Sequence, residues 1–338
     1  MKLPMFLRRL CRILLCIVLV LVLLAGTLVA LGKYESHRLH AQQPDVAAVH
    51  ADRVDGDRLL DDLRWLADPA REGRGAGTPG NAAARAWLVQ QYADIGLEAA
   101  GTDGYLEPFT YVQDGRERPG ANVIGRLAGS DAALPAIVVS AHYDHEGMRR
   151  GEIYPGADDN ASGTAALLAA ARYFAKNPPR HTLLFAAFDA EEAGLRGARA
   201  FVADPLMPLS SIGFNLNLDM VARTDHNEII AVGTWQHPWL RPLLDEVQKE
   251  STVRILFGRD RPWWIAGTHL NWVDASDQGA FHRAGIPFLL FSVEDHADYH
   301  QPTDTVERID PARFEANVEM IVATLLQLDS RIDRFPGD

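Results

Sequence analysis

Residues Gly156–Gly163 read GADDNASG and place two adjacent aspartates, Asp158 and Asp159, between two apolar runs of different character. The run before them, residues 136–141 (AIVVSA), has the composition of a buried strand. The run after them, residues 162–175, is rich in alanine and leucine and predicts a helix that begins just past the aspartates. A strand, a charged loop and a helix in this order form the repeating unit of an α/β fold.

The same rhythm continues on both sides of this stretch. Strands are predicted at residues 122–127, 136–141, 182–188, 214–218, 228–232 and 287–291. Helices are predicted at residues 58–67, 81–95, 162–175, 192–203, 238–249 and 311–328, and a glycine-rich loop lies at 71–80. The alternation predicts the α/β class, with three layers (αβα) around a mostly parallel, mixed central sheet.

An apolar segment near the N-terminus stands apart from this pattern. Residues 13–32 form an uncharged run of 20 residues, which as a helix spans about 30 Å, the thickness of a bilayer core. Four basic residues and no acidic residue precede it. The positive-inside rule then predicts a single-pass anchor in the inner (cytoplasmic) membrane, with the rest of the chain on the periplasmic or extracellular side. A cleaved signal peptide, which would release a secreted protein, is the alternative.

With this apolar segment set apart, the sequence predicts that the chain has four parts. We expect a cytoplasmic tip and transmembrane anchor at 1–32, a polar, helix-poor stalk at 33–56, a catalytic domain at 57–330 and a tail at 331–338. The only cysteines, Cys11 and Cys16, lie in or beside the anchor, so the exported domain needs a core that does without disulfides.

The charge balance excludes one class of partner. The net charge is −12, and without the four basic residues of the leader it is −16, from 29 basic and 45 acidic residues. Such a surface repels a phosphate backbone, so we expect no nucleic-acid partner. Some of the carboxylates are then free to hold metal ions.

Acidic and imidazole side chains follow the predicted strands at their carboxyl ends. In a parallel sheet these ends meet at one edge, where ligands bind, so we expect the side chains to converge there. The residues concerned are His142 and Asp144 after the strand at 136–141, Asp158 and Asp159 before the next helix, Asp189, Glu191 and Glu192 after 182–188, Asp219 after 214–218, and His300 after the last strand.

This inventory suits a pair of divalent cations. A carboxylate can bridge two ions, and imidazole with carboxylate favours zinc, with manganese or cobalt as options. Two metals about 3.5–4 Å apart can polarise a carbonyl and hold a water. Each residue also has a simpler explanation when taken alone: the two aspartates as a helix cap, and Glu191 and Glu192 as a solvated helical turn. Their joint occurrence at strand ends favours the metal site.

Five motifs resemble the zinc aminopeptidases of metallopeptidase family 28. They are HYD (142–144), GADDNASG (156–163), DAEEAGLRG (189–197), NLDM (217–220) and HQPTDT (300–305). They occur in the order and with the spacing of that family, and the resemblance extends over about residues 58–328. The glycine-rich loop is similar to that of bacterial members. The resemblance implies the zinc aminopeptidase fold, a dinuclear zinc centre and peptide substrates with a free N-terminus.

The same resemblance assigns roles position by position. Asp159 would bridge both zinc ions, His142 and Asp219 would complete one site, and Glu192 and His300 would complete the other. In this scheme, Glu191 takes a proton from the attacking water and passes it to the leaving amine.

Neighbouring residues receive supporting roles or none. Asp144 would orient the liganding histidine, and Asp158 would be a supporting residue of the loop. We expect His145 and His296 to be near neighbours of ligands and not ligands themselves, and His282 to be structural. Three tryptophans before the last strand either line an apolar substrate pocket or pack in the ordinary way: Trp263, Trp264 and Trp272.

A metal-dependent aminopeptidase, anchored in a membrane by its N-terminal helix, is the leading hypothesis. A glutaminyl cyclase, which shares the fold but works with one zinc, is the second hypothesis. A non-catalytic ectodomain of the same fold is a third, which the complete ligand set disfavours. A carboxypeptidase like the large multidomain members of the family ranks last, because this chain is short for their extra domains.

Overall fold

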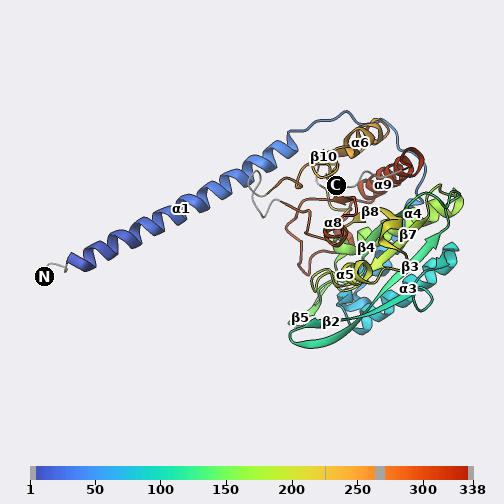
Figure 1. Cartoon of the computed structure of the whole chain (residues 1–338), viewed down its shortest axis with the longest axis horizontal. Coiled ribbons are helices and arrows are strands. Elements are labelled where there is room, and N and C mark those ends of the chain that lie inside the picture. Colours follow the sequence, from blue (N-terminus) through green and yellow to red (C-terminus); the bar gives the residue numbers. More distant parts are fainter. Residues whose placement is uncertain (1–4, 225, 263–270, 334–338) are drawn as a thin grey trace.

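The structure, a computed structural model, describes residues 5–224, 226–262 and 271–333. Within these residues nine strands form one sheet in the order β1-β3-β7-β4-β8-β11-β9-β10, with β2 paired to β3 (Figure 1). The strands are β1 (Glu98–Ala99), β2 (Leu106–Gln113), β3 (Arg116–Leu127), β4 (Ala136–His142), β7 (Leu183–Phe188), β8 (Ile212–Leu218), β9 (Glu228–Val232), β10 (Arg254–Phe257) and β11 (Phe288–Ser292). A separate hairpin, β5 (Gly147–Arg149) and β6 (Glu152–Tyr154), follows β4.

The sheet is mixed, as predicted. Its four central strands, β7, β4, β8 and β11, are parallel to one another. Antiparallel pairs lie on either side, where β3 meets β7 and β9 meets β11. The carboxyl ends of the four central strands therefore lie along one edge, which is the edge where a ligand site was expected.

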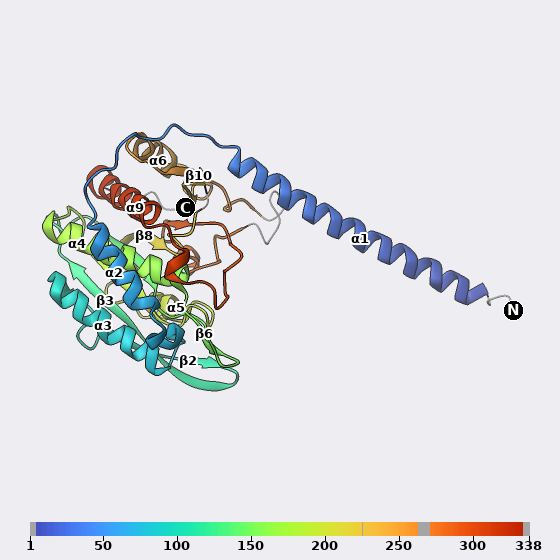
Figure 2. The same ribbon diagram turned by 180° about the vertical axis from the view of Figure 1, so that it is seen from behind.

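Helices cover both faces of the sheet, which confirms the three-layer prediction. Alternate residues of β4 point to opposite faces: Ile137 and Val139 belong to one apolar core and Val138 to the other. Figures 1 and 2 show the helical layers from opposite sides. The larger core packs against α2 (Gly56–Ala67), α3 (Pro79–Ile95), α4 (Gly163–Lys176), α6 (Leu240–Lys249) and α9 (Pro311–Arg331), and the smaller against α5 (Arg196–Ala203) and α8 (Gln278–Arg283).

One predicted helix begins later than expected. The pattern predicted a helix over 192–203, but α5 begins at Arg196. Gly194 (φ 102°) and Leu195 (φ 58°) adopt left-handed backbone conformations, which a helix cannot contain. Glu191 and Glu192 therefore lie on a loop at the end of β7 and not on a helical turn, so their side chains are free to face the edge of the sheet.

The N-terminal segment forms one long helix, α1 (Met5–His40), which projects from the domain (Figures 1 and 2). Its residues Arg12–Leu31 have a mean hydropathy of 3.2 and no contact that buries them, so the helix is long and apolar enough to cross a membrane. The expectation that residues 33–56 are helix-poor is wrong for 33–40. A helix already nucleated by the apolar run extends at little cost, one residue at a time.

The end of α1 and the chain that follows it pack on the domain. Leu39 is buried among residues of β9, β10 and β11. The side chain of Gln42 donates to the carbonyl of Phe257 (3.0 Å) and accepts from its N–H (3.1 Å), which satisfies the edge of β10. Farther along, the N–H groups of Arg53 and Val54 both donate to the carboxylate of Glu319 on α9.

Candidate metal centre

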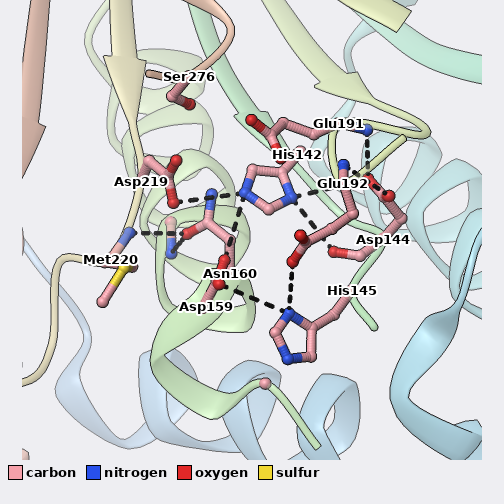
Figure 3. Close-up of polar contacts among 12 residues, drawn as sticks. His142, Asp144, His145, Asp159, Asn160, Glu191, Glu192, Asp219, Met220 and Ser276 are labelled. Carbon is pink, nitrogen blue, oxygen red and sulfur yellow. Dashed lines mark hydrogen bonds and ion pairs between the residues drawn. The ribbon is translucent and has the colours of Figure 1, made fainter. Parts of the chain in front are cut away.

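The five predicted ligands gather at the carboxyl edge of the parallel strands. Figure 3 shows four of them, His142, Asp159, Glu192 and Asp219. His142 is the last residue of β4, and Asp219 follows β8 directly. Glu192 lies on the loop after β7, His300 on the loop after β11, and Asp159 in the turn that precedes α4. The topology explains this convergence, because each of these strands ends at the same edge.

The side chains form two groups that share Asp159. In the first group, His142 Nε2 lies 3.3 Å from Asp219 Oδ1 and 3.5 Å from Asp159 Oδ1. In the second, His300 Nε2 lies 3.0 Å from Asp159 Oδ2 and 3.4 Å from Glu192 Oε2. The two oxygens of Asp159 thus face different groups, which is the arrangement that a bridging carboxylate needs.

His145 also belongs to the second group. Its Nδ1 lies 2.9 Å from Glu192 Oε1 and 3.6 Å from Asp159 Oδ2, and its ring is fully buried. Figure 3 shows this ring facing Asp159 and Glu192. The sequence reasoning set His145 aside; its only sequence signal was a second histidine three residues after His142. His296 lies outside both groups and contacts Asp158 instead (3.1 Å).

The turn GADDNASG separates the roles of its two aspartates. The backbone N–H groups of Asp158 and Asp159 donate to the carboxylate of Asp304, which holds the turn in place. Asp158 Oδ1 accepts from the N–H groups of Ala222 and Arg223 after β8. Asp158 therefore ties the turn to the neighbouring strand, while Asp159 faces the two groups.

Asp144 connects the ends of β4 and β7. Its carboxylate accepts from the N–H of Glu191 at 3.0 Å and of Glu192 at 3.4 Å. The Nδ1 atom of His142 lies 3.2 Å from the carbonyl oxygen of Asp144 and 3.6 Å from its carboxylate. Both contacts leave His142 Nε2 directed at the first group. Asp144 thus positions the predicted ligand His142 and the loop that carries the predicted ligand Glu192.

Burial and crowding shift the titration of these groups. Burial and the neighbouring Glu192 raise the pKa of Asp159 to about 8. Burial also raises the pKa of Glu191 well above its usual range, with Asp277, Asp219 and Glu192 adding to the rise. Burial opposes protonation of His300, but the carboxylates of Asp159 and Glu192 raise its pKa to about 10. Because several carboxyl groups are crowded in a buried space, binding of a cation among them is favourable.

The donor set fits zinc. Imidazole nitrogens and carboxylate oxygens are the ligands that zinc takes in sites of this kind, and the potential ligand atoms of each group lie within 4.8 Å of one another. Among the described residues, Glu192 Oε1 and both ring nitrogens of His145 are buried without a hydrogen-bond partner. Buried polar atoms in native proteins are nearly always paired, so an ion bound here would satisfy Glu192 Oε1 and the facing nitrogen of His145, Nδ1.

The backbone around the candidate ligands is strained. His300 (φ 53°), Met220 (φ 56°) and Ala190 (φ 56°) have left-handed conformations, each in or next to a loop that carries a ligand. Such conformations cost on the order of 1 kcal/mol each and cluster at functional sites. This local cost supports the interpretation of the edge as a built site.

The aromatic residues before β11 are only partly described. Trp263 and Trp264 lie outside the described residues. Trp272 packs against the apolar cluster that contains Leu39, and the guanidinium carbon of Arg259 lies 5.2 Å from its ring centre. For Trp272 the structure therefore supports packing and not a substrate pocket.

Two curated relatives illustrate the sequence similarity. The chain is 29% identical over 227 residues to the aminopeptidase YwaD of Bacillus subtilis, which covers 61% of this chain and 44% of that protein. It is 44% identical over 99 residues to a vacuolar membrane protease of Candida dubliniensis, which covers 29% of this chain and 10% of that protein. The matched region thus spans less than half the length of either relative.

Two solved structures share the fold. BSAP, a zinc aminopeptidase from Bacillus subtilis, superposes with a TM-score of 0.64 at 16% identity, covering 83% of this chain and 98% of that one. A glutaminyl cyclase of Bacteroides thetaiotaomicron bound to N-acetylhistamine gives 0.63 at 17% identity, covering 81% and 98%. Because a hydrolase and a cyclase both match, the fold alone does not decide between these two reactions.

The family comparison covers the site itself. The model of Peptidase family M28 matches residues 122–325, which is more than half of the chain and includes every residue of both groups. The motifs, the sheet topology and the convergence of the strand-end residues agree with this match. The chain belongs to peptidase family M28.

Proposed function

We propose that the protein is a zinc-dependent aminopeptidase that removes N-terminal residues from peptides at a dinuclear centre. The observation that carries the proposal is the pair of ligand groups that share Asp159, with one carboxylate oxygen facing each group. The identity to YwaD, which is named an aminopeptidase, supports the substrate class.

The roles of the ligands follow from the contacts. His142 and Asp219 would hold one ion, Glu192 and His300 the other, and Asp159 both. Zinc bound there would supply positive charge that polarises the scissile carbonyl and makes a water molecule more acidic. Zinc is the first choice for this donor set, and manganese and cobalt accept similar ligands.

Glu191 is the proposed general base. It precedes the proposed ligand Glu192, and its backbone N–H donates to Asp144. Its side chain lies beside His142 (Figure 3) and belongs to neither ligand group. Burial and the neighbouring acids raise its pKa, which makes it a better proton acceptor. In the proposed reaction it takes a proton from the attacking water and delivers it to the leaving amine.

Metal analysis with a Glu191→Gln variant tests this proposal. We expect two zinc ions per full-length chain in both forms, measured by elemental analysis, and hydrolysis of an aminoacyl anilide by the wild type. The amide cannot accept the proton, so the rate should fall by about 10²–10⁴-fold in the variant. One zinc per active chain would favour the glutaminyl cyclase alternative. Two bound zinc ions without turnover of any aminoacyl or dipeptide substrate would refute the aminopeptidase.

We also propose the division of the chain and its location. Residues 1–32 would anchor it in the inner membrane, 33–56 would link the anchor to the domain, 57–330 would be catalytic and 331–338 a tail. The exposed apolar helix Arg12–Leu31 supports the anchor. The basic residues before it favour a catalytic domain on the periplasmic side.

A further inference from the structure

His145 lies with Asp159, Glu192 and His300, and neither the motifs nor the family match assigns it a role. We infer that His145 is a sixth ligand, binding through Nδ1 the ion that Asp159, Glu192 and His300 hold. This inference rests on the proposed dinuclear zinc centre and extends it, since the motifs imply only five ligands.

The first argument is the position of the Nδ1 atom. It lies 2.9 Å from Glu192 Oε1 and 3.6 Å from Asp159 Oδ2, and the ring lies edge-on to that of His300 with centres 5.6 Å apart. Atoms about 2.0–2.2 Å from a common tetrahedral zinc are separated by roughly 3.3–3.6 Å. The separation of Nδ1 from Asp159 Oδ2 matches this range, and its separation from Glu192 Oε1 is shorter than this range.

The second argument is the absence of a competing partner. Among the described residues, neither nitrogen of His145 has a hydrogen-bond partner, and neither does Glu192 Oε1, although Nδ1 and Oε1 are close together. The N–H direction of the ring and the oxygen are therefore misaligned. Leaving Nδ1 and Oε1 unpaired in a buried site costs about 1–3 kcal/mol for each atom, and an ion that binds both removes that cost for these two atoms.

The third argument is that the surrounding chain fixes the ring. A Cβ atom at Gly156 would lie 2.4 Å from His145 Cδ2, so only glycine leaves room for the imidazole. The backbone N–H of His145 donates to the carbonyl of Arg74 in the glycine-rich loop (3.4 Å). Gly156 and the backbone of the glycine-rich loop thus fix the position of His145, whose ring faces Asp159 and Glu192.

The sixth ligand makes the two sites unequal. The group of His145, Asp159, Glu192 and His300 supplies four protein ligands, whereas the group of His142, Asp159 and Asp219 supplies three. Zinc with four protein ligands is held in a closed site, and zinc with three keeps a position open for water or substrate. We therefore assign the open position to the group of His142, and expect the ion bound with His145 to be retained more firmly.

X-ray absorption spectroscopy of the zinc-loaded full-length chain tests the assignment. The inference predicts three imidazole nitrogens over two zinc ions, from His142, His145 and His300. His145→Ala should reduce this number to two and weaken one zinc by at least about 100-fold in a chelator competition, while the other zinc is unchanged. Two imidazole nitrogens in the wild type, unchanged in the variant, would show that His145 contacts Glu192 without binding metal, and would overturn the inference.

A histidine beside the site provides the matched control. His296→Ala removes a ring that contacts Asp158, whose carboxylate keeps its backbone donors Ala222 and Arg223. The control should keep both zinc ions and three imidazole nitrogens. The number of imidazole nitrogens in the wild-type spectrum does not depend on whether a variant folds. It therefore tests the inference even if His145→Ala is unstable. Different results would refute the proposed function: a wild-type chain that binds fewer than two zinc ions, or one that does not hydrolyse the substrates.

Discussion

Asp158 and Asp159 show how two identical neighbours acquire different chemistry. Asp158 accepts backbone N–H groups of Ala222 and Arg223, which stabilise its charge within the protein. Asp159 faces imidazoles of His142 and His300 and the acid of Glu192. Among the described residues no backbone N–H donates to the carboxylate of Asp159, so its charge depends on the two imidazoles and, in the proposed centre, on the metal ions. The same residue type thus serves structure at one position and the proposed metal site at the next.

Glu107 is another buried acid, and among the described residues none of its contacts is with a candidate ligand. It leads to a prediction on how stability depends on pH. Burial raises its pKa from 4.5 to about 7, although Asn122 donates to it. Between pH 4.5 and 7 the folded chain retains a proton that the unfolded chain has lost. The free energy of unfolding therefore falls as the pH rises through this window, by on the order of 2–3 kcal/mol.

Replacing Glu107 by Gln should remove this dependence. The amide oxygen still accepts from Asn122, and no charge is buried at high pH. Urea unfolding should show the variant more stable than the wild type at pH 8 and nearly equal to it at pH 4. Glu117→Gln, on an exposed part of β3, should change stability by less than about 0.5 kcal/mol at either pH. Equal stabilities of Glu107→Gln and wild type at pH 8 would contradict the prediction.

At the scale of elements, the sequence predicted the residues that directly end a strand. His142 and Asp219 could be predicted because an apolar run marks where β4 and β8 end, and parallel strands bring these ends together. His145 was not, since it lies past the strand and is placed by contacts with Gly156 and the glycine-rich loop. Such contacts join segments distant in sequence, and no periodicity records them.

One strand and the start of one helix illustrate what else was not predicted, for related reasons. Strand β2 contains Pro108, which argues against a central strand, but β2 pairs only with β3 and so tolerates it at the edge. The start of α5 depends on left-handed conformations at Gly194 and Leu195. Leucine rarely adopts that conformation, so the helical pattern was extended through it.

The glycine-rich loop gives a prediction at this scale through Arg74. This side chain is fully buried and donates to the carbonyls of Leu66, Tyr143, Pro155 and Gly156. Burial lowers its pKa to about 10, so it remains charged at neutral pH. It therefore fastens α2 to the segments before and after the β5–β6 hairpin, which lead to the ligands.

Arg74→Met should lower the free energy of unfolding by about 3–5 kcal/mol, because buried carbonyls lose their donor. Arg74→Lys should recover little, since an ammonium cannot reach the same carbonyls in the planar geometry of a guanidinium. Urea unfolding of the full chain in detergent measures both. Arg71→Met is the control from the same loop: it loses a stacking contact with Trp65 and should cost about 1 kcal/mol at most. A Lys variant as stable as the wild type would disprove the assigned role.

At the scale of the whole molecule, the anchor and the domain are joined by packing as well as by the chain. Leu39, at the end of α1, completes an apolar cluster with residues of β9, β10 and β11. Gln42 then pairs with both backbone groups of Phe257 on the edge strand. These contacts predict that part of the segment proposed as a stalk, from the end of α1 to Gln42, contributes to the stability of the folded domain.

Two truncations that differ by twelve residues test where the folded unit begins. A chain of residues 33–338 retains Leu39 and Gln42, whereas a chain of residues 45–338 loses both, exposing the cluster and the edge of β10. Burying a leucine contributes about 1.5–3 kcal/mol and each of the two hydrogen bonds of Gln42 about 1 kcal/mol, so the shorter chain should be less stable by about 3.5–5 kcal/mol in urea unfolding. Leu39→Ala in the longer chain should reproduce most of this loss, and Val49→Ala, at an exposed position, should not. Identical unfolding midpoints for the two truncations would show that the domain is complete without the end of α1, and that the contacts of Leu39 and Gln42 contribute nothing to its stability.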